Sequence, residues 1–332
     1  MALTKVTTGT ISDGAIESLK GRNLIINGAM QVAQRGTSTT AINEYLIDRW
    51  RSYGGPMTHT FSQVDDIATY PVTRYALKVQ RTAGDTNTSE YGIATGLESI
   101  DSYPLTGETV TLSFKARCGA DFSPTSNVLR SRIVAGSGTD ASPVAFAEVT
   151  NAAQNNTLTT SVQTFTQSAT ISSSAKQVAV RFDINPTGTA GADDWFEVTE
   201  VQLELGSTAT PFEHETYGET LAKCQRYYQS FGGDNNFDNY AGRSYGTGSA
   251  FWSVPLSVPL RTSPTLTFSG TIRAFGSSGY SDSTSLSVYG YTSGRSLILI
   301  NSTGFSGLTD NRSYNANYIG GTAAVMELDA EL

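Results

Sequence analysis

The stretch Asn23–Trp50, NLIINGAMQVAQRGTSTTAINEYLIDRW, decides how the fold begins. It opens on the apolar run 24–26, and Asn27-Gly28 then predicts a turn, because both residue types tolerate a positive φ. A second short piece, residues 30–34, reads as extended chain. Short extended segments between turn residues are typical of the start of a β-sandwich.

The end of the same stretch returns to apolar side chains after a Ser/Thr loop. Tyr45, Leu46 and Ile47 are followed by Trp50, which we expect to point into a core. An amphipathic helix over residues 24–34 is the alternative to strand, and the Asn-Gly pair inside it disfavours helix.

Composition favours an all-β protein. The chain has 332 residues, of which 38% are hydrophobic and only 16% charged, with 32 Gly and 16 Tyr. Low charge together with many Gly, Tyr and β-branched residues predicts strands joined by many turns. The apolar share is sufficient for buried cores, and the length allows one to three domains.

Charge and hydropathy argue against two classes of partner. The formal net charge of −8 repels nucleic acid and anionic membrane surfaces. No basic run is present, and no apolar stretch approaches the ~20 residues that a membrane helix needs. The N-terminus has no apolar h-region, so we expect no secretory signal.

Residues 22–215 contain short runs of alternating apolar and polar side chains at regular spacing. In WFEVTEVQLEL the apolar phase shifts between Val198 and Val201, which predicts a β-bulge. This regular spacing predicts a jelly-roll β-sandwich. The expected strands are 76–80, 110–116, 128–134, 144–149, 164–171, 178–184 and 195–205.

One helix is expected after residue 215, where Thr216 and Glu219 form a T-x-x-E capping box. An apolar stripe at steps of four and three follows: Tyr217, Leu221, Cys224, Tyr228 and Phe231. The β pattern then returns, with strands expected at 249–255, 265–269, 286–291, 297–301 and 323–332. We therefore divide the chain into an N-terminal attachment arm (1–21), a jelly-roll β-sandwich (22–215), and the helix with a second, smaller β domain (216–332).

The sequence predicts no catalytic centre. Residues 242–246, GRSYG, match the G-x-S-x-G motif around Ser244, but no apolar strand precedes them and no helix follows. Both histidines, His59 and His214, come before Ser244, and we expect His59 on a strand surface. We expect no enzyme activity, no catalytic residue and no cofactor.

Metal and disulfide chemistry are also weakly indicated. Cys118 and Cys224 are far apart and lack zinc-ligand spacing, so two buried thiols are expected. Acidic pairs such as Asp193-Asp194 read as solvated turn formers, with a structural calcium site as the alternative. We assign no metal ligand.

Aromatic residues surrounded by Asn, Asp, Ser and Gly give the strongest binding signal. Flat rings stack on the apolar faces of sugars, and short polar side chains bond hydroxyl groups. The alternative is that half or more of these rings fill cores or cross-strand positions. The glycan-binding candidates are Tyr240, Tyr245, Trp252, Tyr280, Tyr289 and Tyr291.

Four separated motifs resemble those of tail-fibre and related virion proteins of bacteriophages. They are NLIINGAMQVAQRGTS with YLIDRW, VQLELGSTATPFEHETYGETLAKCQRYYQSF, PLRTSPTLTF and MELDAEL. The resemblance implies a jelly roll like that of carbohydrate-binding modules, a virion location, trimeric assembly and contact with the host surface. It also implies that the N-terminal arm docks to the particle or to a stalk. Only about twenty residues precede the first motif, which argues against a long fibre and leaves a short appendage, a knob or a capsid-attached spike as the alternatives.

The leading hypothesis is a homotrimeric tail fibre or spike, made in the host bacterial cytoplasm and incorporated into the virion. Residues 1–21 attach it to other virion proteins, and residues 232–332 face outward and bind host surface polysaccharide. The first alternative is a purely structural capsid-decoration or tail-adaptor protein without receptor contact. The second is a depolymerase or glycosidase with an accessory sugar module.

Overall fold

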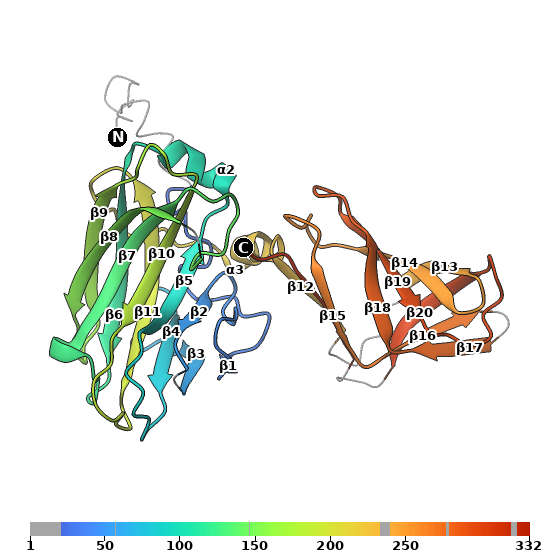
Figure 1. Ribbon diagram of the computed structural model, residues 1–332, viewed down its shortest axis with the longest axis horizontal. Helices are drawn as coiled ribbons and strands as arrows, with labels where there is room; N and C mark the ends of the chain where they lie inside the picture. Colours follow the sequence, from blue (N-terminus) through green and yellow to red (C-terminus); the bar gives the residue numbers. More distant parts are fainter. Residues whose placement is uncertain (1–20, 57, 146, 233–239, 277–278, 320–323) are drawn as a thin grey trace, which may run out of the picture. The chain divides into compact units, whose positions relative to one another are not determined.

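The computed structural model describes residues 21–56, 58–145, 147–232, 240–276, 279–319 and 324–332, so most of the predicted arm lies outside it (Figure 1). The chain divides into two compact units, one ending at Tyr217 and including Leu332, the other Gly218–Glu331. Nearly all regular structure is antiparallel β, which confirms the predicted all-β fold class. No helix in the described part of the chain is long and apolar enough to cross a membrane.

The first unit is a sandwich of two antiparallel sheets (Figure 1). The six-stranded sheet runs β1 (Ser38–Thr39), β3 (His59–Asp65), β4 (Tyr75–Arg81), β11 (Trp195–Leu205), β6 (Thr109–Cys118) and β9 (Gln163–Thr170). The five-stranded sheet runs β2 (Arg51–Gly54), β5 (Tyr91–Gly96), β10 (Gln177–Ile184), β7 (Val128–Gly136) and β8 (Glu148–Thr157). Short helical pieces are α2 (Ser99–Ser102), η1 (Tyr103–Leu105) and η2 (Thr125–Asn127).

One apolar core lies between these two sheets. Val178, Val180 and Phe182 of β10 point into it, because side chains at a spacing of two share a face. Trp50 joins the same core, and its indole N–H donates to the Asn27 carbonyl at 3.2 Å. The inward position of Trp50 and the jelly-roll sandwich are both confirmed.

The predicted bulge in β11 forms hydrogen bonds with the first described segment of the chain, residues 23–28. The register of β11 against β6 shifts between Thr199 and Gln202, which confirms the bulge. The Asn23 amide donates to the Val201 carbonyl at 2.9 Å, and the Val201 N–H donates to the Gly28 carbonyl at 3.0 Å. A Cβ on Gly28 would lie 2.0 Å from the Val201 oxygen, so no larger residue fits there.

The predicted strand over residues 24–34 is wrong: this segment is turn and unpaired extended backbone. Side-chain hydrogen bonds of Asn27 replace a strand ladder. Its Oδ1 accepts from the Val32 N–H at 3.1 Å, and its Nδ2 donates to the Val32 and Asp48 carbonyls at 2.9 and 3.0 Å. The predicted turn is present, with Asn27 at φ 59°.

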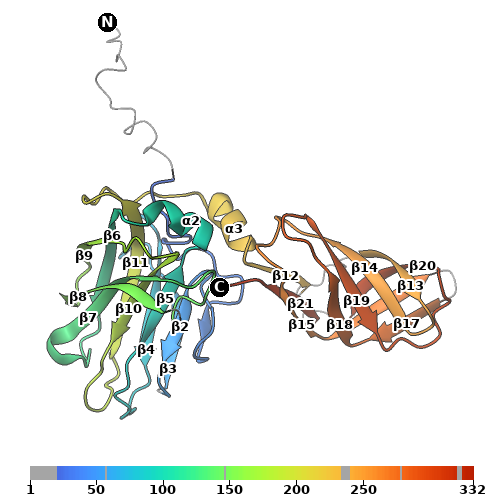
Figure 2. The ribbon, with the colours of Figure 1, turned by 45° about the horizontal axis from the view of Figure 1, so that its top comes forward.

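The second unit is a smaller two-sheet sandwich, entered through helix α3 (Tyr217–Gln225) (Figure 2). Its three-stranded sheet runs β12 (Tyr228–Gly232), β21 (Val325–Asp329) and β15 (Thr265–Ser269). Its seven-stranded sheet runs β17 (Gly279–Ser283), β16 (Thr271–Gly276), β20 (Ser313–Ile319), β13 (Tyr240–Tyr245), β14 (Ser249–Pro255), β19 (Leu297–Thr303) and β18 (Ser285–Gly290). Core residues such as Trp252, Ile300 and Met326 come from both sheets. The short helix and the second, smaller β domain are therefore confirmed.

The predicted helical stripe over residues 217–231 is wrong beyond Gln225. Tyr228 and Phe231 lie in β12, which pairs with β21 along its whole length. Tyr228 is buried, and its hydroxyl donates a hydrogen bond to Glu327 Oε1 at 2.6 Å. Strand pairing in the folded unit overrides the helical spacing of these aromatic residues.

The other errors concern polar strands. The expected strand 144–149 is wrong, because Val144 lies in a turn and β8 begins at Glu148. β8 is an edge strand rich in Asn and Gln, which have low strand propensity. Short Gly-, Ser- and Asn-rich strands are missed for the same reason: β13, β17 and β20.

Candidate functional site

The outer face of the five-stranded sheet carries a polar row. Strand registers align Tyr53, Asp183, Arg130 and Asn155 across this sheet, with Gly92 of β5 between the first two. A Cβ on Gly92 would lie 2.0 Å from a neighbouring main-chain oxygen. With no side chain in between, the Tyr53 hydroxyl reaches the Asp183 carboxylate at 3.0 Å.

Asp183 is the centre of an ion network in this row. Its buried carboxylate accepts from Arg130 Nε at 2.5 Å and lies 2.9 Å from Arg132 Nε. Both guanidinium groups also contact Glu90. Burial raises the pKa of Tyr53 and the Asp183 charge adds to it, so the phenol keeps its proton and donates. Two carboxylates balance two guanidinium groups, and the network is neutral as a whole.

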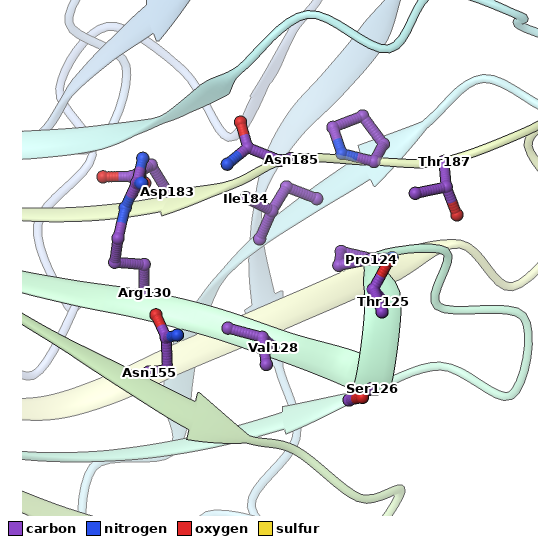
Figure 3. A pocket seen from close by; sticks show the side chains of 11 residues that line it. Pro124, Thr125, Ser126, Val128, Arg130, Asn155, Asp183, Ile184, Asn185 and Thr187 are labelled. Atoms are coloured by element: carbon purple, nitrogen blue, oxygen red, sulfur yellow. Dashed lines mark hydrogen bonds and ion pairs between the residues drawn. The ribbon is translucent and has the colours of Figure 1, made fainter.

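A hollow of about 510 Å³ lies beside this network (Figure 3). Arg130 and Asp183 lie at one end of it, and Thr187 and the η2 residues lie at the other. Its amide and hydroxyl groups suit an uncharged polar ligand, but it has no aromatic ring on which a sugar could stack. The lining residues are Pro124, Thr125, Ser126, Val128, Arg130, Asn155, Asp183, Ile184, Asn185, Pro186 and Thr187.

A fully buried ion pair holds the loops around this hollow. Arg81 Nη1 lies 3.1 Å from Asp194 Oδ2, and Arg81 Nη2 donates to the Gly188 carbonyl at 3.0 Å. The Asp194 carboxylate also accepts from the Ser123 N–H at 3.0 Å. Interpreting Asp194 as a solvated turn former was therefore wrong. Among the described residues, no three His, Cys, Asp or Glu side chains are grouped to hold a metal ion.

Two of the six aromatic candidates are buried in the second unit. Tyr240 and Trp252 are 6% and 1% exposed and belong to the core between the sheets. The prediction that they contact a glycan is wrong, because their ring faces are covered by other core side chains. Both occupy inward positions of their strands, and inward and outward positions alternate along each strand.

Two other candidates have partners within the unit. Tyr291 is half-buried, and its hydroxyl donates to the Leu260 carbonyl at 2.7 Å. Tyr280 is 67% exposed, but the Arg273 guanidinium lies 3.9 Å from the centre of its ring and covers one face. Arg273 also forms a two-bond ion pair with Asp282 at 2.7 and 2.8 Å.

The remaining two candidates form an exposed row with a residue that the sequence did not single out. Phe251 of β14 lies between Tyr245 of β13 and Tyr289 of β18, with ring centroids 6.1 and 4.4 Å away. Tyr245 and Tyr289 are 65% and 64% exposed, and Phe251 is half-buried. We call these three residues the aromatic row; it crosses the strands β13, β14, β19 and β18, which are neighbours in the sheet in this order.

The phase of β14 places Phe251 on the opposite face from Trp252, but only the structure shows which of the two faces is inward. Phe251 alternates with Trp252 and Ala250 in SAFWSVP, so a buried Trp252 places Phe251 on the outer face. Ser287 and Ser253 occupy exposed outer positions on the same strands and offer hydroxyl groups around the rings, whereas the side-chain oxygen of the neighbouring Asn301 is buried. Exposed rings among hydroxyl groups fit the ring face and hydroxyl groups of a sugar.

Other reactive side chains are structural. The buried Ser244 hydroxyl donates to the Thr309 carbonyl at 2.5 Å and accepts from the Arg312 N–H at 3.1 Å. His59 is buried and not on a strand surface as predicted, because its ring packs edge-on against Phe61 at 4.4 Å. Cys118 and Cys224 are buried free thiols, as predicted.

No known sequence family matches the chain, and no curated protein matches it. Among solved structures, it is similar to the enzymatically active domain of tailspike protein 4 of bacteriophage CBA120, with a TM-score of 0.37 and 11% identity over 56% of this chain and 22% of that one. It is also similar to TmCBM61 in complex with β-1,4-galactotriose, with a TM-score of 0.34 and 10% identity over 56% of this chain and 100% of that one. A third is the CBM22-1–CBM22-2 tandem domain of Paenibacillus barcinonensis Xyn10C, with a TM-score of 0.31 and 12% identity over 90% and 97% of the two chains.

Proposed function

We propose that this chain is a bacteriophage virion protein, a tail fibre or spike, that binds a host cell-surface glycan through the aromatic row. The observation that supports the glycan-binding part of the proposal is the solvent exposure of two tyrosines, Tyr245 and Tyr289, on either side of Phe251. Exposed rings in contact with one another present a continuous apolar strip, and such strips on a soluble protein mark interaction sites.

The row suits a sugar better than a protein groove. It is bordered by the exposed Ser287 and Ser253 and by one half-buried aliphatic side chain, Leu299, so hydroxyl groups of a ligand find hydroxyl partners beside the rings. A flat face without a deep cavity gives weak single contacts. Three copies in a trimer engaging one cell would multiply that affinity through avidity, without any new contact.

Attachment through residues 1–21 completes the proposal. The first described residues are fixed to the jelly roll, because the Glu213 carboxylate accepts from the Gly21 and Asn23 N–H groups at 2.8 Å each. The arm thus begins at a defined point of the first unit. We further propose that the protein binds glycan without cleaving it, and incubation with host polysaccharide followed by a reducing-end assay tests that part.

Binding of the full-length purified protein to intact host cells and to a glycan array tests the receptor role. We expect saturable binding that soluble host polysaccharide displaces, and light scattering should give the mass of a trimer. No binding to cells or to any glycan would contradict the receptor role. A cryo-EM position away from the cell-facing surface of the particle would instead support a purely structural virion protein.

A further inference from the structure

The outer face of the seven-stranded sheet has an unbalanced charge. Its outward strand positions in the described residues carry three charged side chains, Arg243, Arg273 and Asp282. Arg273 and Asp282 neutralise each other through two hydrogen bonds. Arg243 is exposed and has no ion pair or side-chain hydrogen bond with any residue that the structure describes. Among the described outward strand positions, Arg243 therefore carries the one charge that no ion pair neutralises.

Arg243 lies beside the aromatic row. It is the direct cross-strand partner of Phe251, and it shares the outer face of β13 with Tyr245, two residues along the strand. Directly paired residues have Cβ atoms about 5 Å apart, so the guanidinium group is within reach of a ligand stacked on these rings. β13 is the central strand of the seven, which places the charge in the middle of the face.

A carboxylate nearby has another role. The Asp310 Oδ1 accepts from the Gly246 N–H at 2.7 Å, and its Oδ2 accepts from the Asn311 amide at 3.2 Å. This carboxylate therefore fixes the turn after β13 and keeps its negative charge there, next to Tyr245. An incoming anion is consequently favoured at Arg243, two residues further into β13, and not at the turn.

We infer that the aromatic row selects an acidic sugar, one that bears a carboxylate, sulfate or phosphate group, with Arg243 as the anion-binding residue. This inference rests on the proposed glycan-binding function and specifies its ligand class. Guanidinium has a rigid donor fork that matches the paired oxygens of these anions, whereas neutral hydroxyl groups use only one donor at a time. The rings hold the sugar ring, and Arg243 distinguishes charged from neutral sugars.

Matched polysaccharides test the inference on the full-length chain. A panel of acidic bacterial polysaccharides is presented in native form and after carboxyl reduction, desulfation or dephosphorylation, so that each pair differs only in the anion. We expect removal of the anion to weaken binding by about tenfold or more. Arg243→Gln should cause a comparable loss on the native polysaccharides only. The anion that matters identifies which of the three groups is recognised.

Arg295→Gln is the matched control, since it removes the same charge from an exposed turn before β19, outside the row. It should leave binding unchanged. Equal binding of native and neutralised polysaccharides, or loss with Arg295→Gln as large as with Arg243→Gln, would overturn the inference while leaving glycan binding intact. Absence of binding to every polysaccharide would overturn both the inference and the proposed function.

Discussion

The Phe251 and Tyr289 ring centroids lie 4.4 Å apart although their strands, β14 and β18, are not neighbours, because β19 lies between them. The large side chains reach across the intervening strand on the outer face. A contact of this kind depends on the order of strands in the sheet. The row is therefore a property of the folded unit and not of any one segment.

Removing one ring of the row should weaken glycan binding without unfolding the protein. We expect Tyr289→Ala and Phe251→Ala each to lower affinity about tenfold, because aromatic stacking contributes roughly 1–3 kcal/mol per stacked ring. Titration calorimetry with the best array ligand measures the change. Tyr103→Ala is the control, as Tyr103 is also an exposed ring but belongs to the first unit; an equal loss there would assign the binding elsewhere.

The two buried candidates should behave in the opposite way. Trp252→Ala leaves a cavity between the sheets of the second unit and should cost about 3–5 kcal/mol of unfolding free energy. Denaturant titration measures this cost. Tyr245→Ala, at an exposed position of the neighbouring strand, should change stability by less than about 0.5 kcal/mol. Comparable stability losses in the two variants would mean that Tyr245 also packs in the core.

Alternation of apolar and polar side chains was the main sequence signal for strands, so the strands that alternate strongly were the ones predicted. Strongly alternating strands such as β10 and β14 were found, and the phase shift between Val198 and Val201 gave the bulge. Which face of a strand is inward could not be read for β13 and β14, where aromatic residues fall on both faces. Tyr240 and Trp252 were consequently grouped with exposed rings, and Phe251 was left out.

Contacts between segments far apart in the chain could not be predicted from local sequence patterns. The polar row Tyr53–Asp183–Arg130 joins three strands from different parts of the chain. Its hydrogen bond between Tyr53 and Asp183 needs a residue without a side chain between them, which is Gly92. The Asn27 side chain likewise satisfies backbone groups on either side of the Ser/Thr loop. A local pattern of apolar residues contains no information on such partners.

Gly28 should tolerate no side chain. Gly28→Ala brings a Cβ to within 2.0 Å of the Val201 oxygen, so either the bulge in β11 or the turn must move. We expect a loss of about 1–3 kcal/mol in unfolding free energy, the usual cost of overpacking. Gly218→Ala is the control, because a Cβ there meets nothing within 4 Å and alanine favours the helix; it should be neutral or slightly stabilising. An unchanged Gly28→Ala protein would contradict the role given to this contact.

The buried pair of Arg81 and Asp194 should be far more important than a surface pair. Arg81→Met leaves the Asp194 charge without its partner in the interior and should cost about 3–5 kcal/mol. Arg74→Met breaks the exposed pair with Asp65 and should change the free energy of unfolding very little, because water screens both charges. Denaturant unfolding of both variants gives the comparison. Adding Asp194→Leu to Arg81→Met should recover part of the loss, because it removes the unpaired charge; a further loss would show that Asp194 acts mainly through Ser123.

Low pH should release the first described residues from the jelly roll. Burial alone would raise the pKa of Glu213, but hydrogen bonds from the Asn23 and Gly21 N–H groups outweigh it and lower that pKa below its ordinary value of 4.5. A carboxylate with a lowered folded-state pKa contributes stability that is complete above the unfolded value and disappears as the pH falls through the folded value. We therefore expect the Gly21 and Asn23 amides to keep their hydrogen-exchange protection factors at neutral pH and to lose them below about pH 4.5.

Glu213→Gln should lower these protection factors already at pH 7 and remove most of their pH dependence, whereas Glu108→Gln, at an exposed carboxylate of the same unit, should change neither. Protection that stays constant from pH 7 to pH 3 in the unmodified chain would show that the Glu213 carboxylate does not hold this end of the chain.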